Sequence, residues 1–290
     1  LLKPGTKSET LASQVEYYLG ETLQQADPNQ LVPETEPASP ATEAWYSLRL
    51  ASYLSEKLDA GSLDVLESIE MPLVPVLATM ERTGITVNRG VLGALTTDLT
   101  AKANDVAQRA FGEIGREINL GSPKQLQEVL FDQLGMPKTR SNKTGFSTDA
   151  ASLADLQDLN PHPFLDLLLQ HRDATKLLQI IASIDKAVDG GGRVHTTYEQ
   201  AGSATGRIAS NDPNLQNVPV KTETGRIIRS AFEAGAEFET LLTADYSQVE
   251  MRIMAHLSGD EGLIEAFNSG EDLHRFVGSR VFGVAPADVT

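Results

Sequence analysis

The sequence feature that most constrains the fold is the stretch Ala244–Arg252, which reads ADYSQVEMR. A short apolar run, residues 241–244, precedes the carboxylate of Asp245, and polar and charged residues at helical spacing follow it. We expect a strand that ends at Asp245 and a helix that carries Gln248 and Glu250. A carboxylate between a strand and a helix is a common way to hold Mg²⁺ near phosphate groups, but it is also a common N-cap. The stretch alone leaves both interpretations open.

Composition bounds the class of protein. The chain has 290 residues, 40% of them apolar, which is enough for two or three globular units. It contains no cysteine, so disulfides and thiolate metal sites are excluded. No run of about 18 apolar residues occurs, so neither a membrane span nor a membrane partner is expected. The chain begins Leu-Leu-Lys without a signal-like segment, and we expect both ends to continue in a longer protein.

The net charge of −16 is distributed unevenly. Residues 1–120 hold 9 basic and 17 acidic side chains, residues 121–230 hold 12 of each, and residues 231–290 hold 3 and 11. A polyanion is therefore expected to meet the middle segment, whereas the C-terminal segment suits cations. The alternative is that the acidity only keeps the protein soluble.

Apolar periodicity predicts a mostly helical N-terminal half. We expect a loop at residues 26–42, which hold four prolines, and helices over residues 8–25, 42–58, 62–84, 89–115 and 163–188. Pro72 and Pro75 predict a kink or break. Residues 85–87 and 193–198 have the alternation of short strands, with Asn88 as a helix N-cap.

The sequence also predicts which parts of two of these helices are buried. Trp45, Leu48 and Leu54 are expected to form the buried face of the helix over residues 42–58. The helix over 89–115 is polar and rich in alanine after its first third, so we expect it to project from the body of the protein.

Two predicted helix starts flank a basic loop. Ser122 suits an N-cap, Pro123 the first helical position and Gly135 the helix end, and residues 147–149 begin the next helix. The loop over residues 138–145 between them is polar and basic. Helix N-termini beside basic side chains favour phosphate binding, although ordinary capping beside a solvated loop explains the same pattern.

Three motifs in order define a resemblance to a known family. Residues 205–207 read TGR and lead into SNDPNLQNVP at 210–219, the ADYSQVE motif continues through Ser258, and residues 271–275 read EDLHR. Their order and spacing resemble the bacterial family A DNA polymerases, the DNA polymerase I family, over about residues 62–290.

The resemblance implies an α+β fold with a mostly helical N-terminal half and thumb and a partial antiparallel palm sheet. It implies that residues 62–190 form the palm-entry helix and thumb and that residues 191–290 form the first part of the palm. Residues 1–61 would be the tail of a degenerate proofreading-exonuclease-like domain.

The resemblance also implies roles at the polymerase centre. Asp245 would be a catalytic carboxylate that, with the backbone carbonyl of Tyr246, holds two Mg²⁺ ions, which activate the primer 3′-hydroxyl and stabilise the leaving pyrophosphate. Gln248 and Glu250 would form the nucleotide pocket, where Glu250 excludes the 2′-hydroxyl of ribonucleotides. His274 would contact the triphosphate. The alternatives are a solvated helix face for Gln248 and Glu250 and a structural role for His274.

The DNA-binding residues follow from the same resemblance. The primer-template minor groove would be contacted by Arg207, Asn214, Gln216, Asn217 and Lys221. Lys221 stands where the family has a second basic residue, so the charge is kept without bidentate geometry. Backbone phosphates would be contacted in the thumb by Ser122, Lys124 and Lys143. Turn formation is the alternative for the asparagines.

Two parts of the family pattern do not occur in the sequence: the fingers segment with its Lys and Tyr, and the His-Asp-Glu run with the second metal carboxylate. We therefore predict that the chain alone is inactive and that the complete protein is a DNA-directed DNA polymerase of replication and repair. That protein would use deoxynucleoside triphosphates and be monomeric, cytoplasmic and associated with the nucleoid. Residues 1–60 hold no Tyr–Asp pair at the proofreading spacing, so no 3′–5′ exonuclease is expected.

Other classes of protein remain open. A non-catalytic clamp for duplex DNA, or one half of a split polymerase, would carry the same motifs. A single-subunit RNA polymerase shares the palm chemistry, but an acid beneath the sugar, Glu250, argues against it.

Overall fold

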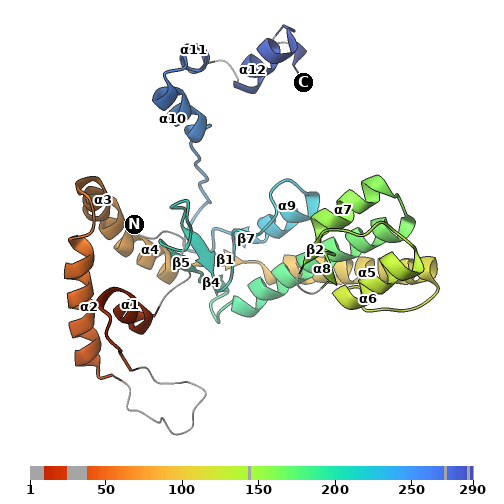
Figure 1. The fold of residues 1–290 in the computed structure, drawn as a ribbon, viewed down its shortest axis with the longest axis horizontal. Coiled ribbons are helices and arrows are strands. Elements are labelled where there is room, and N and C mark those ends of the chain that lie inside the picture. Colours follow the sequence, from red (N-terminus) through yellow and green to blue (C-terminus); the bar gives the residue numbers. More distant parts are fainter. Residues whose placement is uncertain (1–9, 25–37, 143–144, 271–272, 286–287, 290) are drawn as a thin grey trace. The chain divides into compact units, whose positions relative to one another are not determined.

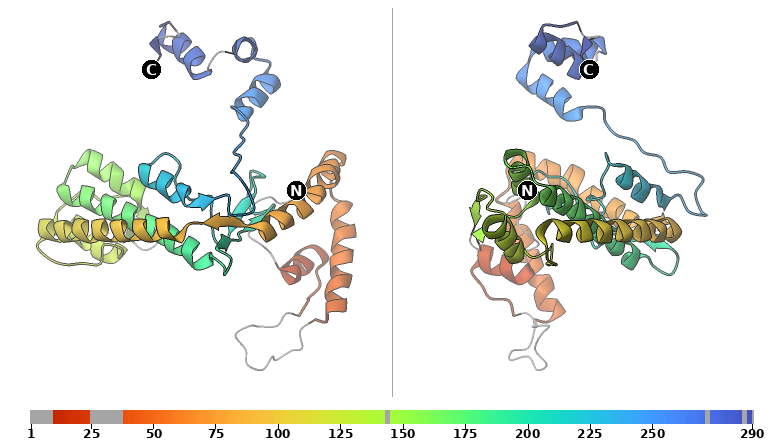
Figure 2. Two further views of the ribbon diagram at one scale, coloured as in Figure 1. Left: turned by 180° about the vertical axis from the view of Figure 1, so that it is seen from behind. Right: turned by 90° about the vertical axis from the view of Figure 1, so that its right-hand side faces the viewer.

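The computed structural model describes residues 10–24, 38–142, 145–270, 273–285 and 288–289. The chain divides into two compact units, Leu1–Glu239 and Thr240–Thr290 (Figures 1 and 2). Helices predominate and the strands are short and antiparallel, which confirms the α+β class. The division into three regions at residues 61 and 190 stays a prediction.

The first unit contains, in chain order, α1 (Leu11–Leu19), α2 (Pro40–Ser55), α3 (Ala60–Val65), a π-helical turn (Leu66–Glu70), α4 (Met71–Thr83), β1 (Ile85–Val87), α5 (Arg89–Ile114), α6 (Pro123–Gln127), a second π-helical segment (Glu128–Gln133), β2 (Ser141–Asn142), β3 (Gly145–Phe146), α7 (Ala150–Leu159), α8 (Pro163–Ala187), β4 (Arg193–Val194), β5 (Thr197–Glu199), β6 (Ala209–Asn211), α9 (Glu223–Ser230) and β7 (Phe232–Glu233). The second unit contains α10 (Val249–Ser258), α11 (Glu261–Ser269) and α12 (Leu273–Phe282).

The helices α1 and α2 share a small core of their own, in which Leu50 of α2 is buried. The expectation that Trp45 and Leu48 are buried is wrong, because their side chains are 52% and 68% exposed. The inward face of α2 runs instead through Tyr46, Leu50 and Leu54, which lie four residues apart. Periodicity alone predicted a neighbouring stripe of the same helix.

The predicted break at the two prolines takes the form of the π-helical turn directly before α4. Pro72 and Pro75 lack N–H groups, so the helix loses two of its regular hydrogen bonds there. A π turn is one way in which a helix accommodates such a loss. The chain then continues to Gly84, where a positive φ of 61° ends α4.

The helix α5 extends away from the strands side by side with α8 and packs against it over its length, so the expectation that it lies outside the packed body is wrong (Figures 1 and 2). Seven of its residues are buried, and two of them, Ala103 and Ala110, are small. Small side chains reduce the apparent hydrophobicity of a helix while they allow a partner helix to approach closely. Arg89 at the start of α5 pairs with Asp185 near the end of α8 at 2.7 Å, so the two helices run antiparallel.

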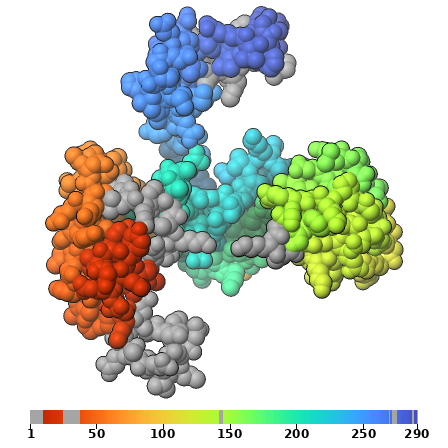
Figure 3. All heavy atoms as spheres, in the orientation of Figure 1, coloured from red at the N-terminus to blue at the C-terminus, as the bar shows by residue number. Residues whose placement is uncertain are grey.

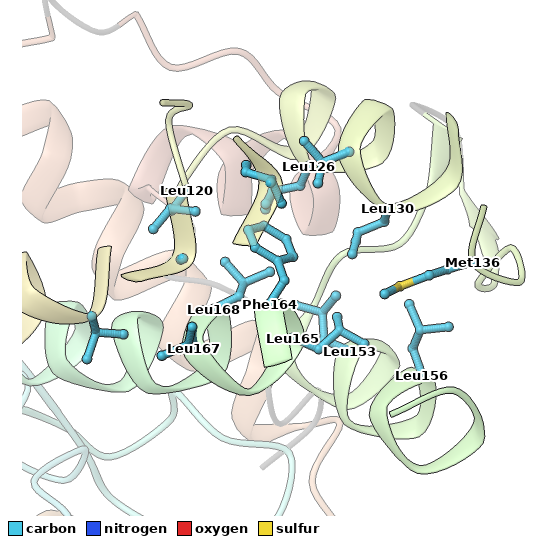
Figure 4. Packing of buried hydrophobic residues seen from close by; sticks show 14 residues of the cluster. Leu120, Leu126, Leu130, Met136, Leu153, Leu156, Phe164, Leu165, Leu167 and Leu168 are labelled. Carbon is cyan, nitrogen blue, oxygen red and sulfur yellow. The ribbon is translucent and has the colours of Figure 1, made fainter. Parts of the chain in front are cut away.

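The largest core gathers around Phe164, which is fully buried (Figure 4). Leucines from α6, α7 and α8 surround its ring, and the outer end of α5 closes the cluster. The space-filling view shows α6 and α7, in yellow and green, closely packed against their neighbours (Figure 3). Burial of each leucine contributes about 1.5–3 kcal/mol relative to its exposure, so this core holds the predicted thumb helices in one body.

A three-stranded antiparallel sheet of order β4-β1-β7 lies where the chain enters α5 and leaves α8. Thr86 of β1 is paired with Arg193 of β4 and with Glu233 of β7. Asn88 ends β1 and caps α5 by accepting from the N–H groups of Gly90 and Val91, as predicted. A separate hairpin, β5-β6, leads into the loop that carries the predicted primer-template residues.

Candidate functional site

The predicted site residues fall in both compact units. Arg207, the SNDPNLQNVP segment (210–219) and Lys221 belong to the first unit, and the ADYSQVEMR stretch (244–252) belongs to the second.

In the first unit, β5 is hydrogen-bonded to α4, and the residue after β5 is hydrogen-bonded to the π-helical turn before α4. The Tyr198 N–H donates to Glu81 Oε1 at 2.7 Å. The Gln200 amide donates to the Glu70 carbonyl at 3.1 Å and to the Glu70 carboxylate at 2.8 Å. Burial raises the pKa of the Tyr198 phenol, with a smaller contribution from Glu81. The strand that precedes Arg207 is therefore fixed to the proline-containing helix.

Arg207 follows a tight turn and has an exposed side chain. The Ser203 hydroxyl accepts from the Thr205 N–H, and Gly206 has a φ of 76°, a conformation that glycine adopts readily. The turn thus presents a guanidinium at the surface of the first unit.

A buried pair of hydroxyls lies beside the polar loop that follows, with Thr196 directly before β5 and Ser210 in β6. Thr196 and Ser210 are only 5% and 3% exposed, and their oxygens lie 2.7 Å apart. A hollow of about 520 Å³ lies beside the loop. Its walls include Lys186 at the end of α8, Glu199 and residues 211–214. Asn214 therefore lines an open concavity of the first unit.

The three predicted amides of this loop differ in what they contact. The Asn214 side-chain oxygen accepts from the N–H groups of Gln216 and Asn217, at 3.0 and 3.1 Å. The Gln216 side chain bonds at both ends, to Ser210 N and to the Ile208 carbonyl. Asn217 is exposed. The Asn214 oxygen therefore forms a turn, which was the predicted alternative to DNA contact. The NH₂ group of Asn214 takes no part in that turn.

Lys221 is exposed at the start of α9, and two further cations lie close to it in sequence. Arg226 and Arg229 are exposed on α9, and the Arg226 guanidinium donates to the Lys221 carbonyl at 3.4 Å. The prediction from sequence did not include these two arginines. Their spacing of three residues on a short helix is the signal that identifies them as neighbours on one face.

The predicted phosphate contacts lie in the thumb region. Ser122 caps α6 by accepting from Gln125 N at 3.5 Å, and Lys124, two residues later, is exposed. Lys143 lies outside the described residues. The second predicted helix start, at α7, carries its own anion, because Asp149 accepts from Ser152 N at 2.8 Å. A carboxylate at that position disfavours a second anion.

In the second unit, Asp245 lies in an exposed segment without regular secondary structure. The expected strand at 241–244 is wrong: Leu242 is 91% exposed, and within the described ranges no strand pairs with this segment. Backbone without a hydrogen-bonded neighbour does not form a strand. The alternative role of Asp245 as an N-cap is also wrong, because α10 has Gln248 at its N-cap position.

The predicted helix is present as α10 and carries Glu250, but the expectation that it also carries Gln248 is wrong, because Gln248 is the N-cap residue before its first turn. Gln248 has a φ of 52°, an uncommon conformation for a residue with a side chain, and Glu250 is exposed in the first turn. The Arg252 guanidinium donates to the Ser247 carbonyl at 3.0 Å and lies 4.5 Å above the Phe267 ring of α11. Tyr246 is 82% exposed. His274 is the second residue of α12, and its side chain lies outside the described part.

The residues present do not complete a metal site. In the part of the chain that the structure describes, no group of three or more His, Asp or Glu side chains converges. Mg²⁺ requires near-octahedral oxygen coordination, and Asp245 with the Tyr246 carbonyl supplies a fraction of that set. No helix among the described residues is long and apolar enough to cross a membrane.

Comparison with known proteins assigns the family. The DNA polymerase family A profile matches residues 89–290, and the chain belongs to that family. It is 49% identical over its whole length to DNA polymerase I of Mycobacterium tuberculosis (strain ATCC 25618 / H37Rv), and 43% identical over 86% of its length to DNA polymerase I of Treponema pallidum. The chain spans 33% and 25% of those two relatives.

A solved structure is similar over the whole chain. The POL domain of Pol1 from M. smegmatis, determined in complex with DNA primer-template and dNTP, is 47% identical with a TM-score of 0.88. The match covers 100% of this chain and 49% of the solved one.

Proposed function

We propose that the chain is part of a bacterial DNA-templated DNA polymerase that acts in DNA replication and repair by nucleotidyl transfer. The observation that carries the proposal is the match to the POL domain of Pol1 from M. smegmatis in complex with DNA primer-template and dNTP. Identity of 47% over the whole chain supports the same class of substrate. The complete protein would be a monomer in the cytoplasm, associated with the nucleoid.

The metal in this proposal is Mg²⁺, with two ions in the complete enzyme. Asp245 and the Tyr246 carbonyl are the groups of this chain that would bind it, and the remaining ligands would come from elsewhere in the complete protein. Asp245 is the one carboxylate that the proposal assigns to the metal, and one carboxylate is too few for a two-metal site, so we expect the chain alone to be inactive. Gln248, Glu250 and His274 would form the wall that meets the deoxynucleoside triphosphate, with Glu250 against the sugar.

The first unit would bind the primer-template. Arg207, Asn214, Asn217 and Lys221 offer exposed donors, which suit the acceptors that every base pair presents in the minor groove. Lys124 and Ser122, with Lys143, would contact phosphates. The balanced charge of residues 121–230, in a chain of net charge −16, supports DNA contact in this region.

Two measurements test the proposal. The chain should bind primer-template DNA, measured by fluorescence anisotropy, with an affinity that falls as salt rises. It should not extend a primer with Mg²⁺ and nucleotides, whereas the full-length protein should. Failure of the full-length protein to extend the primer would refute the polymerase proposal.

A second candidate, a non-catalytic clamp for duplex DNA or one half of a split polymerase, would use the same exposed donors of the first unit, Arg207, Asn214, Asn217 and Lys221. Mixing the chain with a separately produced C-terminal remainder distinguishes the two forms of this candidate. Restored primer extension indicates a split enzyme, and DNA binding without extension in the mixture indicates a clamp.

A further inference from the structure

The loop that would meet the primer-template is held from within by a chain of hydroxyl hydrogen bonds. Leu215 N donates to Ser210 Oγ at 3.2 Å, and Ser210 Oγ lies 2.7 Å from Thr196 Oγ1. Thr196 Oγ1 lies 2.9 Å from the carbonyls of both Asn211 and Pro213. A hydroxyl that accepts one bond while it donates another polarises the next, so the chain acts as a unit.

Gln216 completes this arrangement from the outside of the loop. Its Oε1 accepts from Ser210 N at 3.3 Å, and its Nε2 donates to the Ile208 carbonyl at 2.6 Å. Both bonds are to the backbone, because Ser210 lies within β6 and Ile208 directly before it. The side-chain amide of Gln216 therefore occupies the place that a neighbouring strand would take, and it ties the loop back onto the hairpin.

Asn217, the adjacent amide, differs. It is exposed, and among the described residues its side chain has no hydrogen-bond partner in the protein. The backbone N–H of Asn217 is bound by Asn214, which sets the direction of the turn without using the Asn217 amide. Within the described residues, the side-chain amide of Gln216 is thus hydrogen-bonded to the protein, whereas that of its neighbour Asn217 is not.

We propose that Gln216 is a positioning residue, which fixes the loop through Ser210 and Ile208, and that Asn217 is the amide that contacts the minor groove. The inference rests on the proposed function, because it assigns roles within DNA binding. The sequence predicts that Gln216 contacts base edges in the minor groove, whereas the proposal gives Gln216 the role of holding the loop in place. Ser210 and Thr196 serve the same loop from the buried side.

The test combines protein variants with base analogues that lack the minor-groove N3 acceptor, 3-deazaadenine and 3-deazaguanine. Full-length wild type, Gln216→Met, Ser210→Ala and Asn217→Ala are titrated against a primer-template and against duplexes with one analogue at each terminal base pair in turn. Gln216→Met keeps the length of the side chain without its hydrogen bonds. Ser210→Ala is the matched control, because a residue that is 3% exposed cannot touch DNA.

We expect Gln216→Met and Ser210→Ala to weaken binding by about 3- to 10-fold, by the same factor on every duplex. Asn217→Ala should weaken binding to normal DNA similarly, but its effect should vanish on one analogue duplex. Loss of the Gln216→Met effect on one analogue would show that Gln216 reads a base and would overturn the proposal. An Asn217→Ala effect that is equal on all duplexes would overturn its second half.

Amide hydrogen exchange without DNA tests the support role independently of DNA binding. In the chain itself, Gln216→Met should speed exchange at Ser210 N, whereas Asn217→Ala should not. Unchanged exchange at Ser210 contradicts the positioning role. If wild type binds no primer-template, the proposed function fails and the assignment of Asn217 fails with it, whereas exchange still decides whether Gln216 holds the loop.

Discussion

The Arg193 guanidinium donates through Nε to the backbone carbonyl of Thr83 at 2.6 Å and so joins β4 to the end of α4 across 110 positions of sequence. Two further bonds, each of 3.0 Å, reach the Gly84 carbonyl and the Thr86 hydroxyl. The turn between α8 and β4 holds Asp189. The hydrogen bond that the Arg193 N–H donates to the Asp189 carboxylate is the main cause of its lowered pKa. One side chain therefore fixes the junction between α4 and β4, from which the predicted thumb and the proposed DNA-binding loop both extend.

The first prediction concerns this junction. Arg193→Ala should lower the free energy of unfolding by about 1–3 kcal/mol, because it removes three charge-assisted hydrogen bonds. Urea denaturation followed by circular dichroism measures the change. The matched control is Arg109→Ala, which removes an exposed pair with Asp105 at 3.6 Å and should cost less than about 0.5 kcal/mol. Equal losses in the two variants would contradict the account.

The second prediction concerns close packing between the proposed DNA-binding loop and α9. A methyl group on Gly225 would lie 2.8 Å from the Pro219 carbonyl carbon and closer still to its oxygen. Gly225→Ala should therefore destabilise the protein by about 1–3 kcal/mol and weaken primer-template binding, because backbone atoms must move. Gly93→Ala in α5, where nothing lies within 4 Å, should instead stabilise by about 0.5–1 kcal/mol. A neutral Gly225→Ala variant would show that the loop is free to shift.

The third prediction concerns acid stability. Hydrogen bonds from Ser147 and then Ser152 lower the pKa of Asp149 from 3.8 to about 2. A folded-state pKa below the unfolded one stabilises the fold above pH 4, and this contribution is lost as the pH falls from 4 to 2. In Asp149→Asn, the melting temperature should fall less steeply than in wild type between pH 4 and pH 2. Asp155→Asn, an exposed position of the same helix, should leave the wild-type profile unchanged, and a profile for Asp149→Asn that matches wild type would disprove the role.

The fourth prediction concerns sugar selection and depends on the proposed function. In the full-length protein, Glu250→Ala should raise the incorporation of ribonucleotides relative to deoxynucleotides, because the group that excludes the 2′-hydroxyl is lost. Single-nucleotide insertion assays with matched rNTP and dNTP measure the ratio. Glu261→Ala, an exposed acid at the start of α11, is the control. An unchanged ratio in Glu250→Ala would refute the gate.

Local chemistry made part of the fold predictable from sequence. The caps at Asn88 and Ser122 and the helix end at Gly135 were predicted because each needs only its own neighbours. The face of α2 was not, since Trp45 and Leu50 lie on adjacent stripes and the position of α1 decides between them. Burial of α5 was missed because alanine packs well only where a partner helix lies close.

The candidate site was likewise only partly predictable from the sequence. The motifs were visible in sequence because their residue types and order are specific. The role of Gln216 was not, because the two groups that its amide contacts, Ser210 N and the Ile208 carbonyl, are brought to it by β6. The prediction of a strand before Asp245 was wrong because a strand needs a hydrogen-bonded neighbouring strand, which sequence periodicity does not show.

The most direct test of the central claim is single-turnover primer extension by the full-length protein with Asp245→Ala. The account predicts that extension slows by at least about 1000-fold, which corresponds to about 4 kcal/mol of transition-state stabilisation, while the affinity for primer-template stays within about 3-fold of wild type. Extension at a rate near that of wild type would contradict the assignment of Asp245 as a metal-binding catalytic carboxylate.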